Sequence, residues 1–242
     1  MTGPPPQISV VLPVHNERES LAPLLDAIVA ALGARSYEIL GVDDASSDGS
    51  LEELVRLRAG LPGLRVLRLD ARSGQSAATM AGCDSARGAI VVTLDADGQN
   101  DPADIPRLLH ALDDAPHAVA AVGYRQGKRE NAWRGAQSRF ANRVRDWLTG
   151  DVVRDSACGF RAIRQMAFAG LPRFDGMHRF MPTLIRRQGG VVVEVPVAFR
   201  PRVYGRSKYG VWRRAVRGLP DALGVGWLRR RALRGRVREV EP

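Results

Sequence analysis

The sequence predicts an α/β fold in which helices cover both faces of a doubly wound, mostly parallel β-sheet. Continuous apolar runs such as ISVVL at 8–12 alternate with helical segments, and such runs are typical of strands buried on both faces. The connections between these segments are short, as in sheets whose strands are joined by crossover helices. The 242 residues suffice for one sizeable domain of this kind.

The elements follow one another along the chain. The expected strands are 8–12, 37–42, 64–69, 89–94, 118–122 and 191–199. The expected helices are 17–32, 50–59, 75–86, 102–112, 130–148, 179–187 and a basic amphipathic stretch from 211 to the end. We expect Asn16 and Ser50 to cap the first two helices, and Gly33 to end the first. The expected organisation is a lead-in at 1–7, one domain at 8–210 and a C-terminal segment at 211–242.

The charge is concentrated in the C-terminal segment. The chain carries 36 Lys and Arg against 26 Asp and Glu, a net charge of +10; from Arg200 to Pro242 there are 13 basic and 3 acidic residues. This pattern predicts an anionic partner such as a membrane surface, the alternative being a solubilising tail. Few aromatic residues are available there for stacking, which disfavours nucleic acid.

The sequence predicts a cytoplasmic protein. No stretch approaches the roughly 20 apolar residues of a transmembrane helix, and the lead-in does not have the pattern of a signal peptide. Cys83 and Cys158 lack metal-binding spacing, and we expect both to be free thiols.

Polar residues follow the first, second and fourth expected strands. Because ligands bind at the carboxyl ends of parallel strands, these residues mark a candidate site. They are His15, Asn16, Glu17, Asp43, Asp44, Asp95 and Asp97. The chain has neither GxGxxG after the first strand nor GxxxxGK[ST]. An acidic site without these loops would need a divalent cation to hold a diphosphate.

The segment DADGQ at 95–99 is the expected metal site. In an extended loop Asp95, Asp97 and Gln99 would point the same way and offer three oxygens to Mg²⁺ or Mn²⁺. The other acidic loop offers Asp43 or Asp44 as a contact for the nucleotide. Asp48 is expected to form a structural turn.

The motifs resemble those of family 2 glycosyltransferases, which have the GT-A fold. The matching segments are VVLPVHNE at 10–17, VDDASSDGS at 42–50 and LDADGQNDP at 94–102. GQSAATMAG at 74–82, SACGFRAIR at 156–164 and YGRSKYG at 204–210 are similar to the branch of dolichyl- and undecaprenyl-phosphate sugar transferases. The resemblance extends over about 8–212.

This resemblance implies a role for each candidate residue. The nucleotide-sugar would contact Pro13, His15, Glu17, Asp43 or Asp44, and Asp95. The metal diphosphate would be held by Asp95, Asp97 and Gln99. The acceptor phosphate would be received by Arg125, Arg134 and Ser138. Independently of the resemblance, the polar, glycine-containing loop that follows the last strand suggests a lid, in which Arg202 and Lys208 would close over the diphosphate.

The expected reaction is transfer of a hexose from a UDP- or GDP-linked donor to a polyprenyl phosphate, with inversion. An ionised phosphate attacks without a general base, so Asp97, Arg125 and Arg134 would act by orientation and charge stabilisation. Asp155 would orient the acceptor, or act as base if the acceptor were a hydroxyl group. A hydroxyl acceptor and a binding-only subunit are the alternatives.

Two departures from the resemblance affect these expectations. Position 72 is Arg where many relatives have Asn, which bears on the donor contact. After YGRSKYG many bacterial relatives continue into transmembrane helices, whereas this chain has its basic segment. Attachment to the cytoplasmic face of the membrane is then peripheral or supplied by a membrane-protein partner. The QxxRW element of polysaccharide synthases is missing, which disfavours polymerisation.

Overall fold

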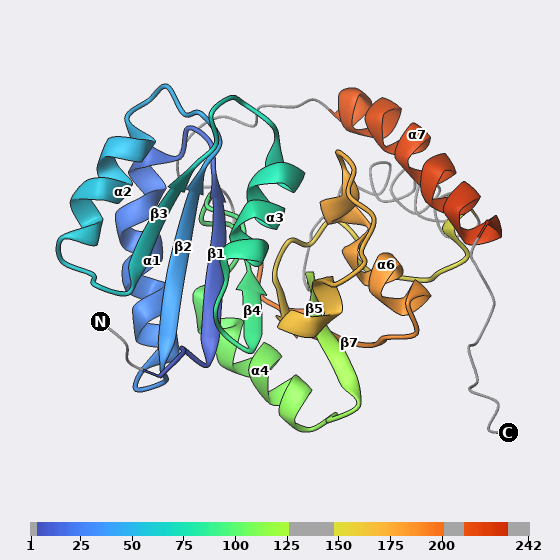
Figure 1. The fold of residues 1–242 in the computed structure, drawn as a ribbon, viewed down its shortest axis with the longest axis horizontal. Helices are drawn as coiled ribbons and strands as arrows, with labels where there is room; N and C mark the ends of the chain where they lie inside the picture. The colour runs from blue at the N-terminus through green and yellow to red at the C-terminus, as the bar shows by residue number, and fades with distance from the viewer. Residues whose placement is uncertain (1–3, 126–147, 201–210, 232–242) are drawn as a thin grey trace, which may run out of the picture. The chain divides into compact units, whose positions relative to one another are not determined.

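The computed structural model describes residues 4–125, 148–200 and 211–231, with the backbone alone for 211–219 and 229. A seven-stranded sheet has the order β3-β2-β1-β4-β6-β5-β7 (Figure 1). The strands are β1 (Ile8–Val14), β2 (Tyr37–Asp43), β3 (Leu64–Arg68), β4 (Ile90–Thr93), β5 (Ala118–Arg125), β6 (Arg161–Arg164) and β7 (Val191–Val197). All pairs are parallel except those of β6 with β4 and β5. The predicted α/β class is confirmed.

Helices connect the strands. They are α1 (Arg18–Leu32), α2 (Ser50–Arg58), α3 (Gln75–Ser85), α4 (Ile105–Asp113), α6 (Met181–Arg187) and α7 (Val211–Arg230), with short 3₁₀ turns η1 (Pro102–Asp104), η2 (Gln165–Phe168) and η3 (Met177–Arg179). Val10 and Leu12 of β1 share one core cluster with residues of α1 and α4. Val11 faces α3, where a side chain at Gly82 would overlap it. Since alternate residues of a strand point to opposite faces, these helices cover the two faces of the sheet.

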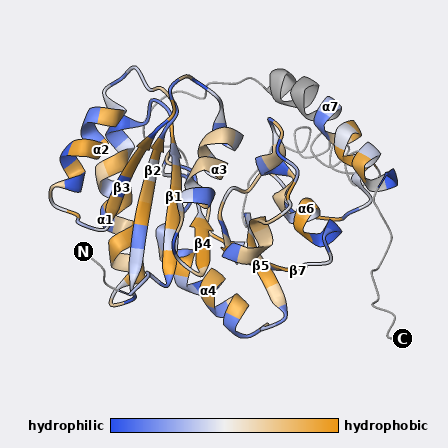
Figure 2. Cartoon of the chain, in the orientation of Figure 1, coloured by the Kyte–Doolittle hydropathy of each residue, from blue (hydrophilic) through white to orange (hydrophobic). Residues whose placement is uncertain are grey.

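The core follows from the apolar runs of the sequence. Figure 2 shows β1, β2 and β4 coloured as hydrophobic over most of their length. Val10, Val11 and Leu12 have no exposed surface, and Ile39 and Leu40 of β2 are equally buried. Strands covered on both faces therefore read as continuous rather than alternating apolar runs.

Sequence reasoning missed β6. This strand of four residues lies antiparallel between β4 and β5, in a stretch for which the sequence predicted neither helix nor strand. It contains Arg161 and Arg164, whose charges conceal the strand pattern. The position of β6 between β4 and β5 matters for the site, because it places the start of β6 beside the carboxyl ends of these two strands.

Two helix caps differ from expectation. Asn16 does not cap α1; it has φ 55° and its side-chain oxygen accepts a hydrogen bond of 2.8 Å from the Ser47 N–H, while Glu17 occupies the cap position. Gly49, with φ 88°, caps α2 in place of Ser50. In both cases, contacts between the loops after β1 and β2 override the local sequence preference for a cap. Gly33 ends α1 as predicted, its N–H donating to the Val29 carbonyl.

The chain divides into two compact units. The first comprises Met1–Arg129 and Val153–Lys208 and contains the sheet; the second comprises Glu130–Val152 and Tyr209–Pro242. In the second unit α7 approaches residue 148 closely, since a Cβ at Gly226 would lie 2.6 Å from the Leu148 carbonyl oxygen. In the described part of the chain, no helix is both long and apolar enough to cross a bilayer.

Candidate active site

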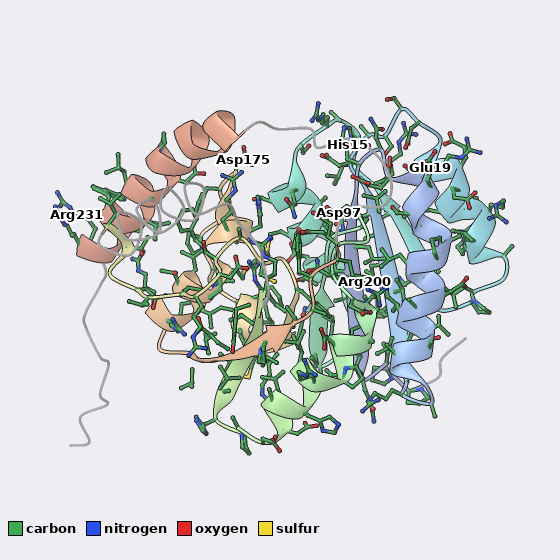
Figure 3. All side chains as sticks on the ribbon, turned by 180° about the vertical axis from the view of Figure 1, so that it is seen from behind. His15, Glu19, Asp97, Asp175, Arg200 and Arg231 are labelled. Atoms are coloured by element: carbon green, nitrogen blue, oxygen red, sulfur yellow. The ribbon has the colours of Figure 1, made fainter. Side chains whose placement is uncertain are left out.

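The carboxyl ends of β1, β2 and β4 meet at one edge of the sheet. Because β1 pairs in parallel with both other strands, the residues that follow them lie side by side. The His15 Nδ1 atom is 2.8 Å from the carbonyl oxygen of Asp44, and Figure 3 shows His15 and Asp97 toward this edge. The structure thus brings together the three polar segments that the sequence marked as a candidate site.

The two carboxylates of the loop after β2 have different surroundings. The Asp44 oxygens accept hydrogen bonds from the backbone N–H groups of Ser73 at 2.6 Å and Gly74 at 2.9 Å. Asp44 thereby holds the turn that precedes α3. Both oxygens of Asp43 lie 3.3 Å from the Ser46 nitrogen. Of the two, Asp43 has the weaker internal contacts and is the better candidate for the nucleotide.

Asp48 has the structural role expected for it. Its carboxylate accepts from the Ser50 hydroxyl at 2.6 Å, the Ser50 N–H at 3.0 Å and the Arg18 N–H at 3.2 Å. Burial opposes ionisation, but these hydrogen bonds outweigh it and lower the pKa of Asp48. Asp48 therefore joins the start of α1 to the start of α2.

The segment 95–99 is a turn, not the extended loop we expected. Gly98 has φ 72°, and the Asp97 carboxylate accepts from the Gln99 N–H at 3.1 Å. The Asp95 carboxylate accepts from the Gln75 side-chain amide at 2.6 Å. The Gln99 carbonyl accepts from the Arg200 N–H, so the turn is fixed to the chain beyond β7.

The carboxylates of this turn suit a magnesium or manganese ion held together with a diphosphate. No group of three His, Cys, Asp or Glu side chains gathers for a metal within the described ranges. Mg²⁺ in phosphate-transferring sites needs only one or two protein carboxylates, since the substrate supplies other oxygens. Space beside Asp95 is kept by Gly159, where a Cβ would lie 2.8 Å from an Asp95 oxygen. Asp95 and Asp97 are therefore suitable ligands for the expected Mg²⁺ or Mn²⁺ ion.

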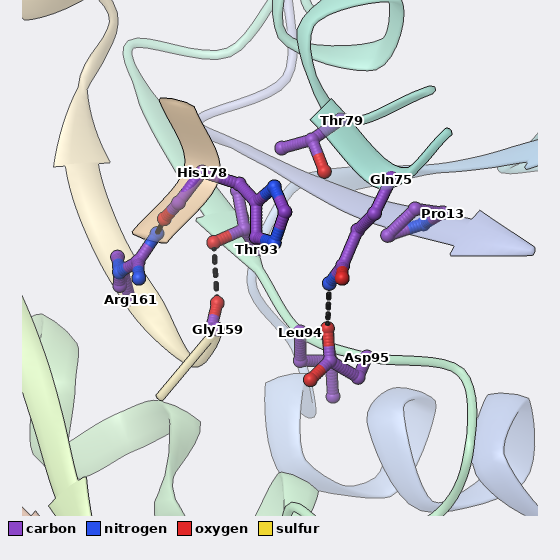
Figure 4. Close-up of a pocket in the computed structure, with 9 residues that line it drawn as sticks. All are labelled: Pro13, Gln75, Thr79, Thr93, Leu94, Asp95, Gly159, Arg161 and His178. Atoms are coloured by element: carbon purple, nitrogen blue, oxygen red, sulfur yellow. Dashed lines mark hydrogen bonds between the residues drawn. The ribbon is translucent and has the colours of Figure 1, made fainter. Parts of the chain in front are cut away.

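A pocket lies beside Asp95. Its lining residues are Pro13, Gln75, Thr79, Thr93, Leu94, Asp95, Gly159, Arg161 and His178 (Figure 4). Pro13 and Asp95 were predicted site residues. Sequence reasoning assigned no role to Arg161 or His178. A cation flanked by Phe160 and the apolar Ala162 was the available signal for Arg161, because charges are rarely placed on buried strands without a purpose.

Arg125 and Asp155, two predicted catalytic residues, form an ion pair. Arg125 Nε lies 2.5 Å from one Asp155 oxygen and Nη2 lies 2.7 Å from the other. The guanidinium carbon is 5.0 Å from the centre of the Phe199 ring. Burial alone would lower the pKa of Arg125. The hydrogen bond and the charge of Asp155 outweigh burial and raise this pKa, with a contribution from the charge of Asp95. The ion pair thus lies within electrostatic range of the Asp95 carboxylate, the candidate metal ligand.

Other predicted residues are placed only in part. Glu17 lies at the start of α1, where its N–H donates to the Ser50 hydroxyl at 3.0 Å. The predicted acceptor and lid residues Arg134, Ser138, Arg202 and Lys208 lie outside the described residues.

Comparison with known proteins gives one family. The model described as "Glycosyl transferase family 2" matches residues 9–171. A protein of Edwardsiella ictaluri named undecaprenyl-phosphate 4-deoxy-4-formamido-L-arabinose transferase is 38% identical over 210 residues, which cover 85% of this chain and 64% of the relative. A Klebsiella pneumoniae protein of the same name is 38% identical over 219 residues, covering 88% and 66%. The chain thus spans just under two thirds of the length of these relatives.

Solved structures share the fold at lower identity. A mannosyltransferase from Pyrobaculum calidifontis, in complex with GDP-Man and Mn²⁺, has a TM-score of 0.63 and 20% identity, covering 93% of this chain and 74% of that chain. Glucosyl-3-phosphoglycerate synthase from Mycobacterium tuberculosis, in complex with Mn²⁺, UDP and glucosyl-3-phosphoglycerate, has a TM-score of 0.66 and 22% identity, covering 90% and 80%.

Proposed function

The chain belongs to glycosyltransferase family 2 and has the GT-A fold, and from this we propose that it transfers a sugar from a nucleotide-sugar to a polyprenyl phosphate. The acceptor is supported by the names of the relatives. The observation that carries the proposal is the geometry of Arg125. Asp155 takes the edge of the guanidinium formed by Nε and Nη2, which leaves the Nη1–Nη2 edge to receive a phosphate in bidentate fashion.

The donor end of the reaction depends on the carboxylates after β4. Asp95 and Asp97 would hold Mg²⁺ or Mn²⁺ together with the diphosphate. The bound ion would act as a Lewis acid on the leaving nucleoside diphosphate. Asp43, Pro13 and His15, at the ends of β2 and β1, would contact the nucleoside.

The acceptor phosphate needs orientation rather than deprotonation. It is largely ionised at neutral pH, since its second pKa is about 6. Both Asp155 oxygens accept hydrogen bonds from Arg125, so Asp155 would position this cation instead of removing a proton. Attack on the anomeric carbon from the side opposite the diphosphate gives single displacement with inversion.

We also propose peripheral binding to an anionic membrane through the second unit. Leu223 and Trp227 of α7 are 53% and 60% exposed, and their i, i+4 spacing places them on one helix face. Arg230 and Arg231 at the end of this helix are exposed as well. Insertion of apolar side chains flanked by cations is the usual mode of interfacial helices. Trp227→Ser should weaken sedimentation with phosphatidylglycerol vesicles, whereas Val55→Ser, at an exposed position of α2, should leave it unchanged.

Nucleotide release tests the reaction. Undecaprenyl phosphate in detergent would be combined with UDP-glucose, GDP-mannose or nucleotide-linked 4-deoxy-4-formamido-L-arabinose, with Mn²⁺, Mg²⁺ or excess EDTA. We expect release from at least one donor that requires both lipid phosphate and metal. Release that needs metal but no lipid phosphate would reject the acceptor, and release unaffected by EDTA would reject the metal.

Two matched arginine variants test the acceptor site. Arg173 also forms a two-bonded ion pair with an aspartate, Asp84, but this pair is exposed and uses Nη1 and Nη2 of the guanidinium. Arg125→Gln should lower kcat/KM for the lipid phosphate about 10–100-fold, as expected for the loss of charge-assisted hydrogen bonds. Arg173→Gln should change it less than twofold. If the two substitutions have equal effects on kcat/KM, Arg125 does not bind the acceptor phosphate.

A further inference from the structure

His178 lies in the pocket beside Asp95. It belongs to η3 and is far in sequence from the carboxylate motifs. In Figure 4 its ring lies on the same side of the pocket as Thr93 and Arg161, with Gln75 and Pro13 on the other. No hydrogen bond joins its Nε2 atom to another described residue. The ring therefore offers one nitrogen to whatever occupies the pocket.

Ser76 sets the tautomer of this ring. The His178 Nδ1 atom lies 2.7 Å from the Ser76 oxygen, which also accepts N–H groups from Gly176 at 3.0 Å and His178 at 3.4 Å. A hydroxyl oxygen has two lone pairs and one proton. With both lone pairs engaged by backbone N–H groups, the proton must point to Nδ1. The proton of the neutral imidazole is then on Nε2, and Nε2 is a hydrogen-bond donor.

The ring is uncharged at neutral pH. Burial lowers the pKa of His178 to about 3, and the positive charges of Arg179 and Arg161 contribute. His178 therefore offers a neutral donor in a pocket that also contains the Asp95 carboxylate.

Arg161 fixes His178 from the main-chain side. Its Nη1 donates to the His178 carbonyl at 2.7 Å, and its Nη2 lies 3.4 Å from the Ser156 carbonyl. Arg161 as a whole residue is 3% exposed, and its Nε has no hydrogen-bond partner among the residues that the structure describes. A cation buried in this way is costly, which indicates a role for it. Ser76 and Arg161 together hold the imidazole in one orientation.

Accepting the proposed glycosyl transfer, we propose that His178 is a binding residue for the transferred sugar, donating its Nε2–H to a hydroxyl or carbonyl oxygen on the sugar ring. A neutral donor suits sugar oxygens better than a diphosphate, for which charged groups are preferred. Thr93 donates its proton to the Gly159 carbonyl at 2.7 Å, so its hydroxyl can only accept from a ligand. Such a mixture of donors and acceptors matches sugar hydroxyls, which do both. Ser76 and Arg161 are positioning residues.

Four variants test this role. His178→Gln keeps an N–H donor near the Nε2 position, whereas His178→Asn places its amide near Nδ1 and His178→Phe keeps an aromatic ring without a donor. Ser76→Ala removes the control of the tautomer. His110→Gln, on the polar side of α4, is the matched control. Thermal melting identifies variants that fail to fold, and the Gln and Asn pair keeps the comparison valid if the Phe variant is lost.

The measurements are kcat/KM for the nucleotide-sugar that the wild type uses, and Kd for the corresponding nucleoside diphosphate with Mn²⁺. We expect the Phe and Asn variants to lower kcat/KM about 10–100-fold and leave Kd within twofold. The Gln variant should stay within about threefold of wild type, and Ser76→Ala should fall between.

Two results would overturn the role of His178. One is an unchanged kcat/KM in the folded Phe and Asn variants while the wild type is active. This result would reject the role of His178 but not the proposed glycosyl transfer. The other is a loss of affinity for the nucleoside diphosphate as large as the loss of kcat/KM, which would mean that His178 contacts the diphosphate instead of the sugar. A wild type that binds no nucleotide-sugar of the panel would remove the proposed function and this inference together.

Discussion

Gly159→Ala should weaken metal binding although residue 159 is not a ligand. A Cβ at this position would lie 2.8 Å from one Asp95 oxygen and 3.1 Å from the other. The backbone cannot easily retreat, because the Gly159 carbonyl accepts from Thr93 at 2.7 Å and β6 begins two residues later. The Asp95 carboxylate must move instead.

The magnitude follows from the contact distances. Ordinary contact with a Cβ begins at 3.4 Å, so the nearer Asp95 oxygen must shift by about 0.6 Å. Metal–ligand distances tolerate only about 0.2 Å. Disturbing the support of a ligand typically costs 10–100-fold in metal affinity. We therefore expect the Kd for Mn²⁺, measured with UDP present, to rise about 10–100-fold.

Calorimetric titration of Mn²⁺ measures this change, and Gly60→Ala is the matched control. Gly60 has ordinary backbone geometry, and a Cβ there would meet only a carbonyl oxygen at 3.9 Å. The control should bind Mn²⁺ as the wild type does. If Gly159→Ala also binds Mn²⁺ as the wild type does while remaining folded, Asp95 is not a metal ligand.

Three further predictions concern stability and reactivity. Asp44→Asn should lower the free energy of unfolding by about 1.5–3 kcal/mol, because hydrogen bonds to a charged group are replaced by weaker or mismatched ones; urea titration at pH 7 measures it, and no loss would contradict the structural role of Asp44. The pKa of His178 in the fold, about 3, lies below its ordinary value of 6.5, so between these pH values the unfolded chain binds a proton that the folded chain does not. Stability should therefore fall as the pH decreases from 6.5 toward 3, by up to about 1.4 kcal/mol per pH unit from this group. His178→Gln should flatten that part of the profile in urea titrations, and an unchanged slope would show that the ring is protonated in the fold. Cys83 and Cys158 are buried free thiols, and burial raises the pKa of Cys158 to about 11 and that of Cys83 further. Neither should react with a thiol reagent at pH 8 until the chain is unfolded, and labelling of the native protein would contradict their burial.

The sheet could be predicted because its signals are local. Apolar runs such as 8–12 and 37–42 are buried strands, and the acids that follow them lie at the edge of the sheet where ligands bind. Asp95 and Pro13, two predicted site residues, line the pocket beside this edge, and their roles in binding stay predictions.

The missed features depend on contacts distant in sequence. Asp44 binds backbone groups 29 and 30 residues away, and nothing in the acidic loop itself distinguishes it from Asp43. Ser76 and His178 are 102 residues apart. The cap expected at Asn16 failed for the same reason, since its side chain reaches Ser47. Local propensity has no information about partners that only the folded chain supplies.

The antiparallel strand β6 sets the distance between the strand that precedes Asp95 and the strand that ends at Arg125. Arg161 pairs with Thr93 of β4 and Val122 of β5, so two interstrand spacings, about 10 Å, separate the strand that leads to Asp95 from the one that leads to Arg125. In the proposed reaction, the sugar and the attacking phosphate would fit between these two strands, with reacting atoms about 3–3.5 Å apart. The peptide from Asp155 to Arg161 contacts both ends, so a change of length in it would disturb donor and acceptor together.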